Sequence, residues 1–291
     1  MSRMAEDYII HPQSLPPNRS GLLIDLPREH AGWEWMSFFV RRLSPDDTYR
    51  AGSATEETAL ILIGGRCRAD WGEGWREIGQ RTTVFDGLPY ALYLPSGSDA
   101  SLEAFTTCEF AECRVPSTAM HSPRLVTPDD AQVSLRGGGN ASRQIVDVIP
   151  PSFPADRIIA VEVYTPAGNW SSFPPHKHDV HNPPAEVDLD EIYYYRMQRP
   201  EGYAHQRLYR ADGSRDLVVT PHDGDCVLIR DGYHPVVAGH GYNCYYLNFI
   251  AGSARSLANT VDPQHAWVMQ TWKEISPGLP MVQRAKAGKQ E

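Results

Sequence analysis

The sequence has no long apolar run. No stretch of its 291 residues approaches the roughly 18–20 consecutive apolar residues that a transmembrane helix requires. Residues 1–7 are polar and lack the apolar segment of a signal peptide. We therefore expect a cytoplasmic protein with no membrane partner.

Positive charge is also scarce. The chain has 27 Lys and Arg against 36 Asp and Glu, which gives a net charge of −9 and a pI near 5.7. No run of lysine or arginine is present, whereas nucleic-acid-binding domains normally carry a basic patch or stripe. We expect no nucleic-acid partner.

Cysteine pairs are missing as well. The five cysteines are scattered and form no C-x-x-C motif, which is typical of a reduced protein rather than of a disulfide scaffold. Cys226 and Cys244 lie within apolar runs, so we expect both to be buried.

Long amphipathic helices do not stand out either. Short runs of Val, Ile, Tyr, Phe and Leu, broken by Gly, Pro, Asp and Asn, predict an all-β protein built from sandwiches or barrels. The glycine-rich stretch 136–142 divides the chain into halves of similar length and strand content. We predict two all-β domains of the same kind, residues 1–135 and 136–291, although no residue-level repeat links them.

The most informative feature that is present is the H-x-H pair His176 and His178. On a strand, side chains two residues apart point to the same face. Glu191 heads an apolar strand, where a carboxylate is unexpected unless it is paired or ligated. His234 follows Gly232 and Tyr233 after another apolar run. Together these four residues predict a metal site in the second half, and the first half has no H-x-H to match it.

Two other interpretations of these residues stay open. Two surface histidines beside a proline-rich loop would need no metal. Three further acids close to Glu191 are alternative carboxylate ligands: Glu186, Asp188 and Asp190. Of these, Asp188 and Asp190 are more typical of solvated loop residues. Three imidazoles and one carboxylate suit one divalent transition-metal ion. Zinc is the first choice, with manganese, iron or nickel as alternatives.

The order H-x-H, Glu, Gly-x-His resembles the metal site of cupins, which are small jelly-roll barrels. The spacing departs from the common cupin pattern, since the gap between His178 and Glu191 is long and the second motif lacks the usual proline. Several segments instead resemble the 5-deoxy-glucuronate isomerase family: 161–165, 168–179, 190–195, 206–209, 232–235 and 245–248. The match covers most of residues 158–270, and 168–179 is its most specific part.

This resemblance implies a bicupin, two tandem jelly-roll β-barrels or sandwiches, with the metal in the C-terminal domain. It implies His176, His178, Glu191 and His234 as the ligands. It also implies aldose–ketose isomerisation of 5-deoxy-glucuronate to 5-dehydro-2-deoxy-gluconate in inositol catabolism. A related family isomerises 5-keto-4-deoxyuronate, so a related deoxy-uronate is the alternative substrate.

Strand alternation then selects residues that are expected to face the metal. Tyr193 and Tyr195 share a face with Glu191, while Ile192 and Tyr194 face away; Tyr246 shares a face with Asn248. For each tyrosine, a plain core role is the alternative. A sugar acid also needs a cation, for which Arg207 is favoured over three other residues: Lys177, Arg196 and Arg230. Asp179 either orients a ligand imidazole or is a loop acid.

The reaction needs a proton moved between adjacent carbons by a base within hydrogen-bond reach, and a metal-assisted hydride shift is the alternative. Two other functions are the alternatives to an isomerase. One is a non-catalytic cupin that binds a sugar acid, and the other is a cupin dioxygenase. In each case we expect a small-molecule ligand and a homo-oligomer.

Overall fold

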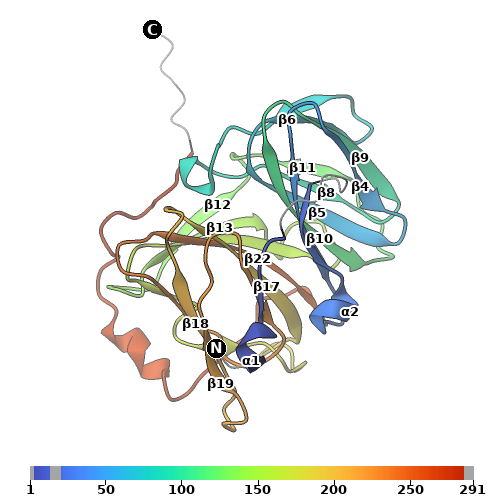
Figure 1. Cartoon of the computed structure of the whole chain (residues 1–291). Helices are drawn as coiled ribbons and strands as arrows, with labels where there is room; N and C mark the ends of the chain where they lie inside the picture. Colours follow the sequence, from blue (N-terminus) through green and yellow to red (C-terminus); the bar gives the residue numbers. More distant parts are fainter. Residues whose placement is uncertain (1–2, 14–20, 285–291) are drawn as a thin grey trace.

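The computed structural model of the protein describes residues 3–13 and 21–284. Strands dominate it and the named ladders between them are antiparallel, so the predicted all-β architecture of two tandem sandwiches is confirmed (Figure 1). The helical segments are short: α1 (Arg3–Glu6), α2 (Arg28–Ala31), η1 (Val84–Asp86) and η2 (Ala266–Thr271).

The first half forms a sandwich of two sheets. A six-stranded sheet has the order β11-β8-β5-β10-β3-β2, with β2 (Leu22–Leu26), β3 (Ser37–Leu43), β5 (Glu56–Gly64), β8 (Ala91–Leu94), β10 (Cys108–Pro116) and β11 (Arg124–Val126). A four-stranded sheet has the order β4-β9-β6-β7, with β4 (Thr48–Ser53), β6 (Cys67–Asp70), β7 (Arg76–Ile78) and β9 (Ser98–Ala104).

The second half is built around a seven-stranded sheet. Its order is β1-β20-β17-β22-β14-β13-β12, with β1 (Ile9–Ile10), β12 (Gln132–Arg136), β13 (Arg143–Ile149), β14 (Ile159–Thr165), β17 (Leu189–Met197), β20 (Cys226–Ile229) and β22 (Cys244–Gly252). Facing it are β15 (Trp170–Ser171), β18 (Ala204–Tyr209), β19 (Asp216–Val219) and β21 (Val236–Ala238). The pair β16 (His176–Lys177) and β23 (Thr260–Val261) completes this half.

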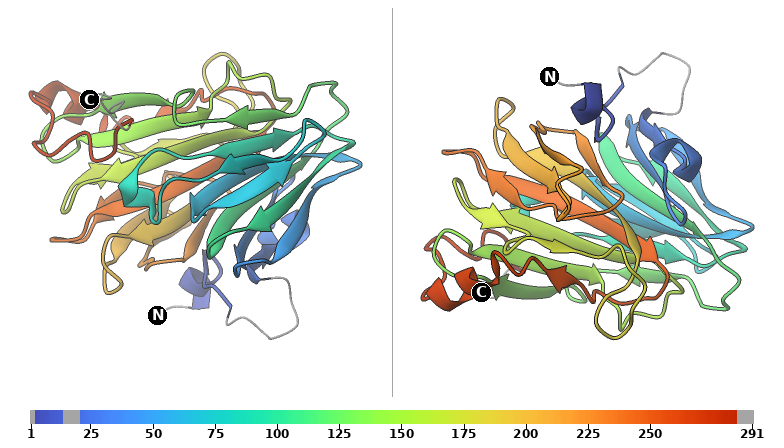
Figure 2. Two further views of the ribbon diagram at one scale, coloured as in Figure 1. Left: turned by 90° about the horizontal axis from the view of Figure 1, so that it is seen from above. Right: turned by 90° about the horizontal axis from the view of Figure 1, so that it is seen from below.

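The largest sheets of the two halves pack face to face, and Figure 2 shows the strands of both halves as stacked layers. Alternation along each strand sends one set of side chains into this shared core and the other set into the interior of its own sandwich. Phe38 of β3 lies 6.1 Å, between ring centroids, from both Tyr194 and Phe249 of the opposing sheet. The halves are therefore joined by an apolar core rather than by a linker alone.

The seven-stranded sheet also takes strands from outside the predicted second domain. β1 pairs with β20, and β12, which spans the proposed division after residue 135, pairs with β13. The domain boundary itself stays a prediction. All five cysteines are free and buried, as expected for Cys226 and Cys244. Within the described residues, no helix is long and apolar enough to cross a bilayer.

Candidate metal centre

The H-x-H pair lies at a short strand, since His176 belongs to β16 and His178 directly follows it. β16 pairs with β23, which places His176 opposite Val261 and Lys177 opposite Thr260. Since side chains alternate, both histidines turn inward while Lys177 turns to the other side. There Lys177 forms an ion pair with Glu186 at 2.7 Å and a second one with Asp179.

Glu191 reaches the same point from the middle of the large sheet. It lies on β17 between Ile229 of β20 and Ile250 of β22, and it is buried. A carboxylate at such a position is costly unless it meets charge or hydrogen-bond donors. The role of Glu191 therefore depends on the groups that contact its carboxylate.

His234 arrives on the loop between β20 and β21, and two contacts fix this loop. The Gln206 side-chain amide donates to the His234 carbonyl at 3.1 Å, and Asp179 accepts from the Gly232 backbone N–H at 2.8 Å. Gly232 has a φ of 75°, and a Cβ at this position would lie 2.5 Å from the Tyr209 carbonyl oxygen. Only glycine fits this turn. Asp179 therefore holds the loop that carries a predicted ligand rather than an imidazole.

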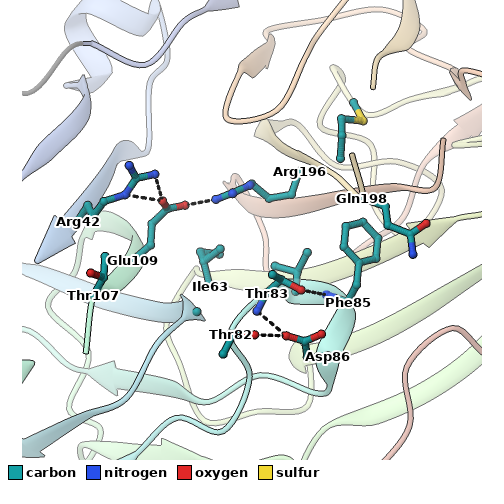
Figure 3. Close-up of a pocket in the computed structure, with 13 residues that line it drawn as sticks. Arg42, Ile63, Thr82, Thr83, Phe85, Asp86, Thr107, Glu109, Arg196 and Gln198 are labelled. Carbon is teal, nitrogen blue, oxygen red and sulfur yellow. Dashed lines mark hydrogen bonds and ion pairs between the residues drawn. The ribbon is translucent and has the colours of Figure 1, made fainter. Parts of the chain in front are cut away.

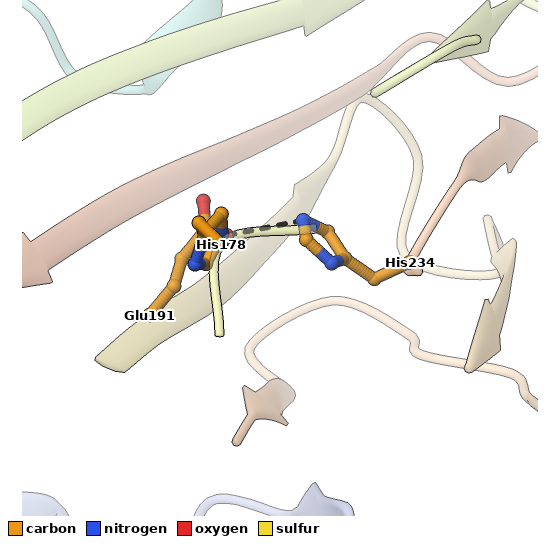
Figure 4. A group of neighbouring side chains, drawn as sticks. All are labelled: His178, Glu191 and His234. Carbon is orange, nitrogen blue, oxygen red and sulfur yellow. Dashed lines mark hydrogen bonds and ion pairs between the residues drawn. The ribbon is translucent and has the colours of Figure 1, made fainter. Parts of the chain in front are cut away.

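Three of the predicted ligands form a tight buried group (Figure 4). The Nε2 atoms of His178 and His234 lie 2.9 Å and 3.3 Å from the same Glu191 oxygen, Oε2. One ligand atom from each residue lies within 4.8 Å of the others. Residues from β17 and from two separate loops are thus brought together.

The fourth predicted ligand, His176, lies next to this group. Its ring centroid is 4.9 Å from that of His234 and 6.3 Å from that of His178. Burial lowers the pKa of His176 to about 3, with a further contribution from the two neighbouring imidazoles. The ring is therefore neutral and has a lone pair available for a cation.

The ring hydrogens are arranged as a metal site requires. His178 Nδ1 donates to the Leu189 carbonyl at 3.2 Å, and His234 Nδ1 donates to the Gly232 carbonyl at 3.0 Å. This leaves Nε2 of each ring directed at Glu191. Metal-binding histidines commonly donate their other ring N–H to a carbonyl or carboxylate in this way.

The charges of the group also fit a cation. Burial by itself would raise the pKa of the Glu191 carboxyl, but His178 and His234 outweigh it and bring the pKa down to about 2. The buried His234 Nε2 has no hydrogen-bond partner among the described residues. When both rings are neutral, their Nε2 lone pairs face the carboxylate and repel it unless a positive charge lies between them. The residues present therefore fit a divalent metal ion bound by nitrogen and oxygen.

A cavity of about 280 Å³ opens beside the ligands. It is lined by His176 and Glu191, by residues of β12, β13, β14 and β22, and by the segment 257–272. Two of the predicted catalytic residues, Tyr193 and Tyr246, line it. The Tyr193 hydroxyl lies 2.8 Å from Ser172 Oγ, and the Tyr246 hydroxyl donates to Ser171 Oγ at 3.0 Å.

The other two predicted catalytic residues do not line this cavity. Tyr195 is buried behind it, where its hydroxyl donates to the Gln206 side-chain oxygen at 2.9 Å. Arg207 forms a two-point ion pair with Asp216 at 2.7 and 2.8 Å, and its guanidinium stacks over Tyr209. The physical reason is alternation on β18: Gln206 points inward, so Arg207 points outward.

The remaining predicted cations are also held elsewhere. Arg196 is bound to Asp223 at 2.9 Å and to Glu109, and Arg230 donates to the Ala31 carbonyl. Lys177 is held in its two ion pairs beside the H-x-H strand. The structure instead brings Arg136, Arg143 and Asp147 to the cavity. Alternation along 143–147 is the sequence signal for Arg143 and Asp147, because both share a face with Ile145.

A larger cavity, about 530 Å³, lies between the halves and away from the ligands (Figure 3). Its buried acid, Glu109, already binds Arg42 at 2.8 Å and also binds Arg196. Because these charges satisfy one another, the cavity beside the histidines is the better candidate for chemistry.

Residues 9–268 match the KduI/IolB family. This chain belongs to the KduI/IolB family. Relatives named 5-deoxy-glucuronate isomerase include proteins from Geobacillus thermodenitrificans, at 41% identity over 88% of this chain and 94% of the relative, and from Bacillus subtilis, at 31% identity over 86% and 93%. The resemblance stated from the sequence is confirmed.

Two solved structures have a similar fold. The crystal structure of an IolB-like protein from Salmonella typhimurium matches this KduI/IolB chain with a TM-score of 0.86 and 35% identity. The match covers 90% of this chain and 98% of the other. Oxalate decarboxylase from Bacillus subtilis matches with a TM-score of 0.60 and 14% identity, over 87% and 78%. The second likeness concerns the fold alone, and it agrees with the bicupin architecture.

Proposed function

We propose that this KduI/IolB-family protein is an aldose–ketose isomerase that converts 5-deoxy-D-glucuronate to 5-dehydro-2-deoxy-D-gluconate. The observation that carries the proposal is the cavity into which Glu191, His176 and polar residues of the large sheet all point. The names of relatives that match most of the chain support the same substrate. A non-catalytic sugar-acid-binding protein is not favoured by these relatives.

We further propose that His176, His178, Glu191 and His234 hold one divalent metal ion, with zinc as the first choice over manganese, iron and nickel. When bound, the ion would polarise the substrate carbonyl and stabilise negative charge that develops on its oxygen. The ligand set suits zinc because it combines imidazole nitrogens with a carboxylate oxygen. Elemental analysis of the purified protein tests the choice.

The cavity walls supply the rest of the chemistry. Burial raises the pKa of Tyr246 to about 12, so its hydroxyl is protonated at neutral pH and can donate to a substrate oxygen in place of Ser171. Tyr193 lies between Tyr246 and the ligand group, with its ring 4.7 Å from that of Tyr246 and 5.8 Å from that of His234. Tyr195 acts indirectly, because it orients Gln206, which in turn holds the His234 loop.

The proton must be carried by a group that faces the cavity. Asp147 does so, and it lies on β13 opposite Val161 of β14. Burial raises the pKa of its carboxyl, against the opposing charge of Arg136. A carboxylate with a raised pKa is a better proton acceptor near neutral pH. We therefore assign Asp147 as the group that moves the proton through an enediol.

The substrate is tested by incubating the protein with 5-deoxy-glucuronate and, separately, with 4-deoxy-5-keto-uronate, and by reading the products with NMR. We expect turnover of the first compound at a higher kcat/KM than of the second. Binding of both compounds without turnover would support the sugar-acid-binding alternative. The predicted homo-oligomer and cytoplasmic location stay predictions, and light scattering of the purified protein tests the oligomer.

A further inference from the structure

Two arginines of the cavity have no role in the proposed chemistry so far. Arg136 and Arg143 lie directly opposite each other in the β12–β13 ladder, and both line the cavity. Like charges directly opposite each other on neighbouring strands are destabilising. An arrangement of this kind is stabilised when a shared anion lies between the two side chains.

Arg143 is the more enclosed of the two. It is half-buried, and the hydrogen bond it makes is from Nη1 to the Ala141 carbonyl at 3.1 Å. Among the described residues, no carboxylate lies within ion-pair distance of it, whereas the buried Arg81 binds Glu162 at 2.7 Å. A guanidinium offers five N–H donors in a fork that matches a carboxylate. Most of the donors of Arg143 are thus free for a ligand.

The turn before β13 makes room for this guanidinium. Gly137 has a φ of 88°, and a Cβ at that position would lie 2.9 Å from Arg143 Nη1 and 2.0 Å from the Ala141 carbonyl oxygen. The glycine-rich stretch between β12 and β13 is therefore required where the arginine folds against the turn.

The register places Arg143 away from the metal ligands but in the same cavity. Gln144 pairs with Tyr164, so the neighbouring Arg143 lies level with Thr165 of β14. Across the next two strands, this level continues to Cys244 of β22 and to Met197 of β17. Met197 is six residues from Glu191 on β17, which is about 20 Å along a strand.

The side chains between these levels connect the two ends. Tyr193 and Tyr246 lie on the levels between them, and both line the same cavity as Arg143. One cavity therefore runs from Arg143 past the two tyrosines to Glu191.

Resting on the proposed function, we propose that Arg143, assisted by Arg136, binds the carboxylate of the sugar-acid substrate while the carbonyl end lies at the metal ligands. The acids of the cavity leave this position free. Asp147 lies on the level of Tyr193 and Asn248, nearer the ligands, and Glu191 is held by the histidines. Arg143 thus selects an acid over a neutral sugar and sets which end of the molecule reacts.

The test compares Arg143→Gln with wild type on two substrates: 5-deoxy-glucuronate and the neutral sugar with a hydroxymethyl group in place of the carboxylate. A hydrogen bond between two charged groups is typically worth enough to raise KM about 10- to 100-fold for the acid when it is lost. We expect the KM for the neutral sugar to stay within about twofold and the bound metal to stay unchanged. Arg136→Gln is expected to show a smaller rise, because Arg136 is exposed.

The matched control is Arg50→Gln, because Arg50 is an exposed arginine of the first half that pairs with Asp99. Its KM for the acid should equal that of wild type. Equal KM values for the Arg143 and Arg50 variants overturn the proposal, as does an equal loss on both substrates with metal content intact. If Arg143→Gln does not fold, Arg143→Lys decides: its KM should rise for the acid alone, and an unchanged KM overturns the proposal.

Failure of the proposed function looks different. If wild type binds D-glucuronate in a calorimeter but turns over neither uronate, the isomerase proposal fails. The carboxylate site is then judged by the Kd for D-glucuronate, which should rise in Arg143→Gln and not in Arg50→Gln. If wild type isomerises the acid and Arg143→Gln does so with the same KM, the carboxylate site fails alone.

Discussion

At the scale of single residues, the site depends on where each ring hydrogen goes. His178 and His234 donate one N–H each to a backbone carbonyl, so the second nitrogen faces the carboxylate of Glu191. The sequence predicts the four ligands because H-x-H on a strand and a carboxylate heading an apolar strand are local patterns. It does not predict the tautomers, since the carbonyls that fix them come from other parts of the chain.

Alternation also explains which of the predicted side chains face the cavity. It places Tyr193 and Tyr246 toward the cavity and Ile192 and Tyr194 into the core between the halves. It does not decide between Gln206 and Arg207, because the inward face of β18 is set by its position in the opposing sheet. The cation expected at Arg207 is instead available at Arg143.

Asp147→Asn tests the group that is proposed to move the proton. Removing a group that moves the proton should lower kcat about 10²- to 10⁴-fold, because general acid–base catalysis contributes that much. KM and bound metal should change little, since Asp147 is not in the ligand group. Steady-state kinetics together with elemental analysis measure all three. A kcat within threefold of wild type would remove Asp147 from the reaction.

At the scale of elements, the metal group depends on loops that are fixed by side chains from distant strands. Gln206 of β18 and Asp179 both hold the His234 loop, and Lys177 links Asp179 to Glu186. These contacts lie around the ligands and leave the ligands few conformations, which favours metal binding.

Gly232→Ala should therefore weaken metal binding, with Gly213→Ala as the matched control. Both glycines have φ near 75°, so alanine costs about 1–2 kcal/mol of backbone strain at either site. A Cβ at Gly213 meets nothing within 4 Å, whereas one at Gly232 meets the Tyr209 carbonyl. We expect metal affinity to fall about 10- to 100-fold in Gly232→Ala alone, as measured by chelator competition. Equal metal affinity in the two variants would show that the loop does not position His234.

At the scale of the whole molecule, a charged cluster crosses the apolar contact between the halves. Burial would raise the pKa of the Glu109 carboxyl, but Arg196, the Tyr194 hydroxyl and Arg42 together outweigh it, so the pKa lies below its usual value. Composition predicts two sandwiches, but it does not predict this packing. The pairing of β1 with β20 is equally hidden, since more than 200 residues separate the strands.

This cluster makes stability depend on pH. A lowered folded-state pKa means that Glu109 stabilises the protein above its unfolded value, about 4.3, and that this contribution is lost as pH falls through the folded value. Glu109→Gln should lower the free energy of unfolding by roughly 3 kcal/mol at pH 7, and this variant should lose less stability in acid than wild type does. Glu103→Gln, at a surface pair with Arg68, should cost at most about 1 kcal/mol. Denaturant melts from pH 3 to 7 measure both, and parallel curves for the two variants would contradict the assignment.

The most direct test of the central claim is turnover of 5-deoxy-glucuronate, followed by NMR, with the protein as purified, stripped by a chelator, and restored with zinc. We expect formation of 5-dehydro-2-deoxy-gluconate by the purified protein, loss of this activity on stripping, and its return with the ion. Full activity in the stripped protein, verified as metal-free by elemental analysis, would contradict it.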